Sequence, residues 1–548
     1  MRSRRWWDLS GAVRLAPADA TAVPALLACV CTGGPLTVVV AAGRPDLAAY
    51  TAFGAFTGLY ARNELYRQRA LTLAVAAAVL VASVAIGAVV GVLTDSGIAH
   101  VLVVAGVAGL AKLVLDVVRA GPPGALMPTM AAAITVTAVT GADLALVAVG
   151  LCAASATWSW LVCMSPRLIR PDGPQRVAIA DALRAVARRV ESIDTPSHDS
   201  ARHAAALALE RAWHAFSVLP RGDASEQFEV LLVHAETVMR EARLAVAAGS
   251  PPAKEAAVRC RQLAVLLRGG SVPQIAASVE ELAELAGVWA AARLGATSHA
   301  PLQRTPRPSR LTGLTNLRFG SPEVALAGRT ALAAAVAGLA AEAVGLGHSY
   351  WASVSAVAVL APMNLSGATQ RAVQRATGSA LGVLIAVVAL AAVPRPEATA
   401  ALVIVCTALA ELTVTRNYGV AMLFTTPIAL MLSALAHPLP PVVLARDRVL
   451  DTVLGAAVAV AVALMLPNRG LAQAVQVALD AAQATLDDAS TTAPADRLAT
   501  ARVVAARLSA LRTAYDAAAG EPWWQDVPAE RVLVVERAGH TTLARLTR

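Results

Sequence analysis

Hydrophobic residues occur along this chain in two groups of long blocks, and a region of mixed apolar and charged residues separates them. The first group has six apolar segments, at 21–42, 47–60, 71–93, 98–118, 125–140 and 144–164. The second group also has six, at 324–344, 351–363, 372–393, 399–414, 418–436 and 449–466. A bilayer core about 30 Å thick takes about 20 residues of helix to cross. The pattern therefore predicts an all-α polytopic membrane protein with two six-span halves.

The region between the two groups has the periodicity of amphipathic helices. Apolar residues recur at helical spacing among charged ones in four stretches, at 177–190, 201–219, 228–246 and 274–294. This spacing is typical of a soluble helical bundle, and the chain after Pro467 shows it again. We therefore predict five parts, namely membrane halves at 1–165 and 323–467, a cytosolic helical domain at 166–295, a basic proline-rich linker at 296–322, and a cytosolic helical tail at 468–548.

Arginine side chains mark one end of the predicted spans. They precede the first span and follow the second, fourth and sixth spans, and the second half repeats part of this order. The residues are Arg2, Arg4, Arg5, Arg14, Arg62, Arg67, Arg69, Arg119, Arg167, Arg170, Arg176, Arg371, Arg375 and Arg416. Basic residues of this kind stay on the cytosolic side of a membrane. We therefore predict a multi-pass protein of the plasma (inner) membrane with both termini and the middle domain in the cytosol.

Composition narrows the function further. Hydrophobic residues make up 57% of the chain and charged residues 15%, whereas soluble proteins carry about 25% charge. The net charge of +9 comes from residues that flank apolar blocks, so we expect contact with anionic lipids and no nucleic-acid partner. The sequence has no P-loop, HExxH or GxSxG motif and no CxxC pair. We therefore predict no enzyme activity, no catalytic residue, no metal and no cofactor.

An internal repeat relates the two membrane halves. The segment Leu110-Ala-Lys-Leu113 matches Leu409-Ala-Glu-Leu412 at an offset of 299 residues, and the same offset places Pro128 on Pro427. Each predicted half begins and ends on the cytosolic side. The sequence therefore predicts two parallel six-helix transmembrane repeats related by an axis along the membrane normal.

Charged residues inside the predicted spans are candidates for function, because a charge in hydrocarbon is costly. Lys112 and Asp116 lie four residues apart, which suits an ion pair on one helix face. Glu411 occupies the repeat-equivalent position of Lys112, and Arg416 ends the same span. We expect Glu411 and the Lys112/Asp116 pair near the interface of the halves, where they carry a coupled proton or balance charge. The alternative is a purely structural pairing.

Two further features point to a transport site. Arg448 and Asp451 face the same way on the last predicted span. The second span of each half is short, and glycines precede it at Gly33-Gly34-Pro35 and at Gly345-Leu-Gly347. Short or interrupted helices at matching places indicate a transporter site, since their free backbone groups can meet a polar solute. A tilted or interfacial helix is the alternative.

Several motifs in the second half resemble the fusaric acid resistance family of bacterial inner-membrane proteins. They are His348-Ser-Tyr-Trp351, Pro362, Gln370-Arg-Ala-Val-Gln-Arg-Ala-Thr-Gly378, Gly382, Asn417-Tyr418, Thr425-Thr-Pro427, and Arg448 with Asp451 and Gly455. The first half resembles that family mainly in layout. The family includes aromatic acid exporters and has plant relatives that act as malate channels. The resemblance implies export of aromatic or other organic carboxylates, with envelope proteins as partners.

Together these features predict a secondary exporter of small organic acids. Arg371 and Arg375 would attract the carboxylate from the cytosol, and His348, Tyr350 and Trp351 would line the outer gate. A passive anion channel is one alternative and would conduct without proton coupling. A membrane scaffold that binds a partner through its cytosolic domain, without flux, is the other. The substrate, the coupling ion, the oligomeric state and the roles of the domain and tail stay open at this point.

Overall fold

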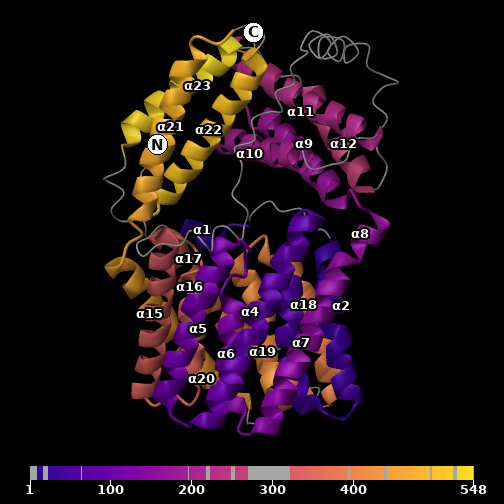
Figure 1. Cartoon of the computed structure of the whole chain (residues 1–548), viewed down its shortest axis with the longest axis vertical. Helices are drawn as coiled ribbons and strands as arrows, with labels where there is room; N and C mark the ends of the chain where they lie inside the picture. The colour runs from indigo at the N-terminus through magenta and orange to yellow at the C-terminus, as the bar shows by residue number, and fades with distance from the viewer. Residues whose placement is uncertain are drawn as a thin grey trace. The chain divides into compact units, whose positions relative to one another are not determined.

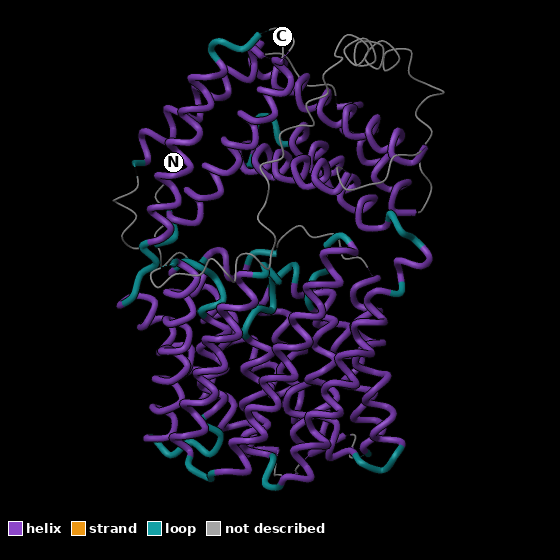
Figure 2. Tube along the Cα trace, in the orientation of Figure 1, coloured by secondary structure: helices purple, strands orange, loops and turns teal. Residues whose placement is uncertain are grey.

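The computed structural model describes residues 9–546 except 16–21, 63, 196, 217–222, 249–253, 270–320, 393–394, 437–440, 494–495 and 522–527. All regular secondary structure in these residues is helical (Figures 1 and 2). The chain divides into two compact units. The first, here called the membrane unit, contains 1–168, 308–470 and 519–524, and the second, the amphipathic unit, contains 169–307, 471–518 and 525–548.

The membrane unit contains two sets of helices, which we call its first half (9–168) and its second half (321–470). After the short helix α1 (Ser10–Val13), the first half consists of α2 (Ala22–Ala41), α3 (Ala48–Ala55), α4 (Tyr66–Leu93), α5 (Gly97–Val117), α6 (Leu126–Ala138), α7 (Ala142–Met164) and α8 (Pro166–Ile169). The second half consists of α15 (Pro322–Ala343), α16 (Tyr350–Val359), α17 (Leu365–Ala392), α18 (Pro396–Val414), α19 (Tyr418–Ala436) and α20 (Pro441–Met465).

Nine helices in the described residues are long and apolar enough to cross a membrane. The prediction of an all-α membrane protein is therefore confirmed, but three of the predicted spans are shorter than a full crossing. Helix α6 has 13 residues, α16 has 10 and α3 has eight, with short 3-10 helices on both sides of α3. Gly43 and Gly345, which precede the two shortest helices, both adopt a positive φ that favours glycine and turns the chain.

The two shortest helices, α3 and α16, lie inside the membrane unit. Every residue of α3 is buried, and so is every residue of α16 after Tyr350. A helix that is apolar on all sides is stable only when other helices surround it. Glycines permit this close packing, because a side chain at Gly54 of α3 would collide with α7, and one at Gly455 of α20 would collide with α16.

A short segment between α22 and α23 also belongs to the membrane unit. The backbone oxygen of Gly520 accepts a hydrogen bond of 2.9 Å from the amide of Ser366, and Glu521 Oε1 accepts one of 3.2 Å from the amide of Leu365. These bonds satisfy amides in the first turn of α17, which no intrahelical acceptor can reach. Burial raises the pKa of Glu521, and the charge of Arg329 opposes this shift.

The amphipathic unit contains α9 (Gly173–Glu191), α10 (His198–Phe216), α11 (Asp223–Ala248), α12 (Lys254–Gly269), α21 (Gly470–Ala489), α22 (Arg497–Ala518) and α23 (Ala529–Leu546). Its helices come from both of the parts predicted as a middle domain and a tail, which the structure joins in one compact unit. The predicted helix at 274–294 lies outside the described residues, as does nearly all of the linker predicted at 296–322.

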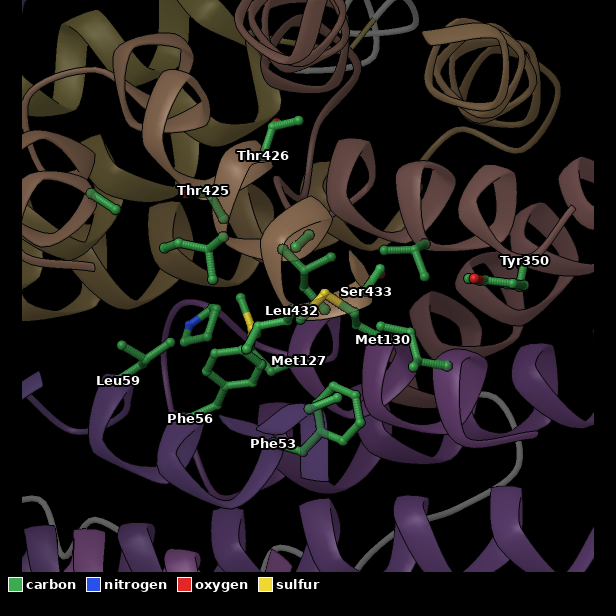
Figure 3. Close-up of a pocket in the computed structure, with 18 of the residues that line it drawn as sticks. Phe53, Phe56, Leu59, Met127, Met130, Tyr350, Thr425, Thr426, Leu432 and Ser433 are labelled. Atoms are coloured by element: carbon green, nitrogen blue, oxygen red, sulfur yellow. The ribbon is translucent and has the colours of Figure 1, made fainter. Parts of the chain in front are cut away.

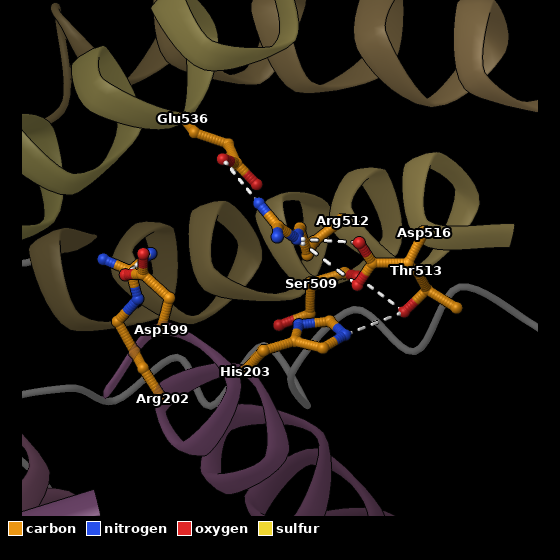
Figure 4. A network of polar contacts seen from close by, with 8 residues as sticks. All are labelled: Asp199, Arg202, His203, Ser509, Arg512, Thr513, Asp516 and Glu536. Carbon is orange, nitrogen blue, oxygen red and sulfur yellow. Dashed lines mark hydrogen bonds and ion pairs between the residues drawn. The ribbon is translucent and has the colours of Figure 1, made fainter. Parts of the chain in front are cut away.

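Polar contacts connect the two parts of the amphipathic unit. Arg502 of α22 forms an ion pair of 2.9 Å with Glu236 of α11. Thr513 of α22 contacts His203 of α10 at 3.4 Å, and within the tail the neighbouring Arg512 pairs with Glu536 of α23, also at 3.4 Å (Figure 4). Burial raises the pKa of Glu536, and Arg512 opposes this shift. Because these contacts cross between distant segments, sequence periodicity alone did not predict them.

Candidate functional site: a cavity in the membrane unit

A cavity of about 1130 Å³ lies between the two halves of the membrane unit. Its lining comes mainly from α3, α6 and the 3-10 helix Phe56–Leu59 of the first half and from α16 to α20 of the second. This volume is of the size that holds a small organic ligand. Figure 3 shows part of the lining of this cavity and the helices that border it.

The first half supplies an apolar wall. This wall consists of Phe53, Phe56, Leu59, Met127 and Met130. In Figure 3 these side chains extend from the helices of the first half toward the labelled residues of the second. The rings of Phe53 and Phe56 lie 6.3 Å apart between centroids, which is a normal distance for an aromatic pair. The wall can therefore receive an aliphatic or aromatic group.

The second half supplies three arginines. Arg371 and Arg375 lie one turn apart on α17, and Arg448 lies on α20. Two aromatic residues hold these guanidinium groups in place. Arg375 Nη1 donates a hydrogen bond of 2.8 Å to the Tyr418 hydroxyl, and Arg371 lies 4.0 Å from the centre of the Tyr418 ring. Arg448 stacks on Trp351 at 3.6 Å, and cation–π contact of this kind stabilises a desolvated cation.

None of these three arginines forms an ion pair within the described residues. Arg375 is 3% exposed and Arg448 is 4% exposed. Among the residues that the structure describes, Arg375 Nε and Arg448 Nε and Nη1 are buried and have no hydrogen-bond partner. An unpaired buried charge costs several kcal/mol, so a site of this kind favours an anion that supplies the missing acceptors.

Asp451 follows Arg448 by one helical turn and is completely buried. The two residues share a helix face, as predicted, but no ion pair within 4.0 Å joins them. Both carboxylate oxygens of Asp451 lack a hydrogen-bond partner in the described residues. The carboxylate nevertheless lies within electrostatic range of Arg448.

The predicted gate residues lie together at the predicted outer end. His348 and Tyr350 line the cavity, with their rings 5.9 Å apart, and His348 Nδ1 lies 3.1 Å from Asp447 Oδ2. Trp351 is not part of the lining. It is buried and acts through its stacking on Arg448.

The other intramembrane charges are arranged differently from the expectation. Glu411 lines the cavity and pairs with Arg62 at 2.5 Å. Lys112 pairs with Asp116 at 2.6 Å, as the spacing predicted, but neither of these residues lines the cavity. Arg416 is exposed and also lies outside the lining.

Helix packing explains why Glu411 and Lys112 do not form one cluster. Helix α18, which carries Glu411, packs against α2, whereas α5, which carries Lys112, packs against α15. Each residue therefore lies on a helix at an interface between the halves, but the two interfaces are different. Equivalent positions in two repeats need not be neighbours.

Sequence reasoning missed Arg62 and Tyr418 as parts of the site. Arg62 was interpreted chiefly as a topology signal, and nothing in the linear pattern indicates its partner. Tyr418 was part of the Asn417-Tyr418 motif, which was the available signal for it. In the described residues no three His, Cys, Asp or Glu side chains gather as metal ligands.

This fold and cavity define a multi-pass α-helical membrane protein with a cationic and apolar internal site. Residues 334–462 match the family model described as fusaric acid resistance protein-like. The matched region contains the second-half residues of the candidate site, from His348 to Asp451. The family resemblance predicted from the sequence motifs is therefore confirmed.

A curated relative supports the same class. It is the uncharacterized membrane protein YvaC of Bacillus subtilis (strain 168), which is 25% identical to this chain over 431 residues. The alignment covers 74% of this chain and 66% of the relative, so the chain spans just under two thirds of that protein. No solved structure matches this chain.

Proposed function

We propose that this protein is a secondary transporter that exports small organic carboxylates, aromatic ones above all, across the plasma membrane. One observation carries the proposal. Three arginines that have no ion-pair partner among the described residues line a cavity that also has an apolar wall. A carboxylate can accept two parallel hydrogen bonds from a guanidinium, while the apolar wall gains about 25 cal/mol for each Å² of apolar surface that it covers.

The arrangement of the helices supports the predicted pair of parallel repeats. Helices α5 and α18 begin 299 residues apart, at Gly97 and Pro396, and so do α7 and α20, at Ala142 and Pro441. Packing between the halves is reciprocal. Helix α2 packs against α18, and their counterparts in the other half, α15 and α5, pack against each other. A cavity between two such repeats is where parallel-repeat transporters bind their solutes, and movement of one repeat against the other then opens each side in turn.

Two polar pairs are suited to close the ends of the cavity. Arg62 and Glu411 join the two halves near the predicted cytosolic end. His348 and Asp447 join the loop before α16 to α20 near the predicted outer end. In this proposal, separation of the halves on the cytosolic side breaks the Arg62–Glu411 pair, whereas the His348–Asp447 pair lies within the second half and opens through its own loop. Both chain termini are cytosolic, as the arginine distribution predicts.

The test is efflux of benzoate from vesicles that contain the purified full-length protein, with and without a pH gradient. We expect saturable benzoate efflux, weaker efflux of acetate, and none of the uncharged benzyl alcohol above the rate of protein-free vesicles. A benzoate current across a voltage-clamped bilayer, with no response to the pH gradient, would support a passive anion channel instead. Absence of benzoate efflux above protein-free vesicles would contradict transport and favour the scaffold alternative.

A further inference from the structure

Asp451 is a buried acid that the anion site described above does not use. It is 0% exposed, and both of its carboxylate oxygens lack a hydrogen-bond partner in the described residues. An ionisable group that is buried without a partner is costly, so it is a candidate for function. Its position relative to Arg448 indicates which function it has.

Few charged groups surround Asp451. Those within electrostatic range are Arg448 and Asp447 on its own helix and Tyr350 at the start of α16. Helix α20 also packs against α15 and α17, and Arg375 of α17 lies within electrostatic range of Arg448. Arg448 is therefore its main partner of opposite charge, one turn away on the same helix.

We propose that Asp451 is the counter-ion of Arg448 in the empty cavity and takes up one proton when a carboxylate binds there. This inference rests on the proposed anion site and adds proton coupling to it. In the empty state the positive Arg448 and the negative Asp451 balance one another. A bound carboxylate supplies the negative charge for Arg448 itself and repels a second negative charge nearby, which favours the neutral form of Asp451.

The proton balance has a direct consequence for transport. The proton comes from the solvent on the side where the anion enters, and it leaves Asp451 when the anion departs. The charge in the Arg448 region is then the same in the empty and the loaded protein, which avoids moving an unbalanced charge through the bilayer. Anion and proton cross together without net charge, so export follows the gradient of the acid and not the membrane potential.

Linkage gives the measurable quantity. If anion binding takes up a proton, lower pH strengthens anion binding by the same coupling. With one full proton per anion, the Kd for benzoate rises about tenfold for each pH unit in the window where Asp451 changes its charge. Above and below this window the Kd does not change with pH.

The experiment is calorimetric titration of the purified full-length protein with benzoate at about pH 6, 7 and 8. Each titration is run in two buffers with different ionisation enthalpies, because the difference in heat counts the protons taken up. We expect the wild-type protein to take up nearly one proton per benzoate at one or more of these pH values. Benzenesulfonate stays ionised at all three pH values, so it cannot take up the proton itself. We expect its binding to take up as many protons as benzoate binding, which would place the proton on the protein.

Two variants locate the proton. Asp451→Asn should bind benzoate with no proton uptake and with a Kd independent of pH. Glu397→Gln is the control, since Glu397 is an exposed acid at the start of α18 and lies outside the cavity lining, and it should keep the proton uptake. Uptake that persists in Asp451→Asn, or that disappears in Glu397→Gln, would overturn the proposal.

The wild-type protein alone also decides the question if the Asp451 variant does not fold. Benzoate binding without proton uptake at any of the three pH values would overturn the role of Asp451 and leave the anion site intact. No benzoate binding at all would instead contradict the proposed function on which this inference rests.

Discussion

The two halves of the membrane unit have the same order of helices but present different side chains to the cavity. Positions 299 residues apart illustrate the contrast. The second-half residues Arg371, Arg375 and Arg448 correspond to Thr72, Ala76 and Val149 of the first half. Conversely, the first-half residues Phe53, Phe56 and Leu59 correspond to Ala352, Ser355 and Ala358 of the second.

This difference indicates the kind of solute that fits the cavity. Two identical halves would place identical groups on opposite walls, and such a site would suit a symmetric or uniform ligand. Here the first half contributes the apolar side chains named above and the second half contributes Arg371, Arg375 and Arg448, while other charged residues of both halves, among them Arg62, Arg119 and Glu411, also line the cavity. A solute with an apolar body and one anionic end satisfies both walls at once, whereas an inorganic anion leaves the apolar wall without contact. The two halves therefore share an order of helices but differ in the side chains that they contribute to the cavity.

The largest expected effect comes from the cationic wall. Arg375→Gln removes a charged donor from a buried position, and charge-assisted hydrogen bonds contribute about 1.5–3 kcal/mol each. We expect the efficiency of benzoate efflux to fall about 100-fold. Arg416→Gln is the matched control, because Arg416 is an exposed arginine outside the cavity, and it should change efflux by less than about twofold. Wild-type efflux from the Arg375 variant would show that the cationic wall does not bind the substrate.

A smaller effect is expected from the ion pair that joins the halves. Arg62→Glu or Glu411→Arg alone places like charges together in a partly buried site, and we expect efflux to fall about tenfold. The double variant restores opposite charges and should recover part of this loss, measured at equal protein level in the vesicles.

The repeat-equivalent residue provides the control for this exchange. Lys112→Glu combined with Glu411→Lys should show no mutual rescue, because Lys112 pairs with Asp116 and not with Glu411. Rescue by this second exchange would mean that the two halves approach each other differently during transport.

The long helices were predictable from the sequence because a run of about 20 apolar residues has few alternatives to a membrane helix. The segment predicted at 98–118 is α5 at Gly97–Val117, and the one predicted at 399–414 lies within α18 at Pro396–Val414. The shortness of α3 and α16 was also visible, because glycines precede them. The full length of the segment at 125–140 was overestimated, since α6 has only 13 residues.

Most partners across the cavity were not predictable. Arg375 and Arg448 were identified as single residues, but their stacking and hydrogen bonds to Trp351 and Tyr418 depend on how helices pack. Hydrophobic periodicity does not encode such pairs. Phe56 illustrates a second limit, because an aromatic residue in an apolar segment has the same sequence signal whether it faces lipid, core or cavity.

The smallest expected effect concerns the apolar wall, and it tests whether the first half contributes to specificity or only to structure. Phe56 lines the cavity and is half-buried, and its second-half counterpart is the small Ser355. Phe56→Ala removes apolar contact with the body of the solute. We expect the preference for benzoate over acetate to fall about fivefold, which corresponds to about 1 kcal/mol. This is a fraction of the roughly 1.5–3 kcal/mol that burial of a whole apolar side chain contributes. Phe56→Leu should keep most of the preference. Acetate efflux should stay unchanged, because acetate has almost no surface to lose. An equal loss for both solutes would identify Phe56 as a packing residue and assign specificity to the cationic half alone.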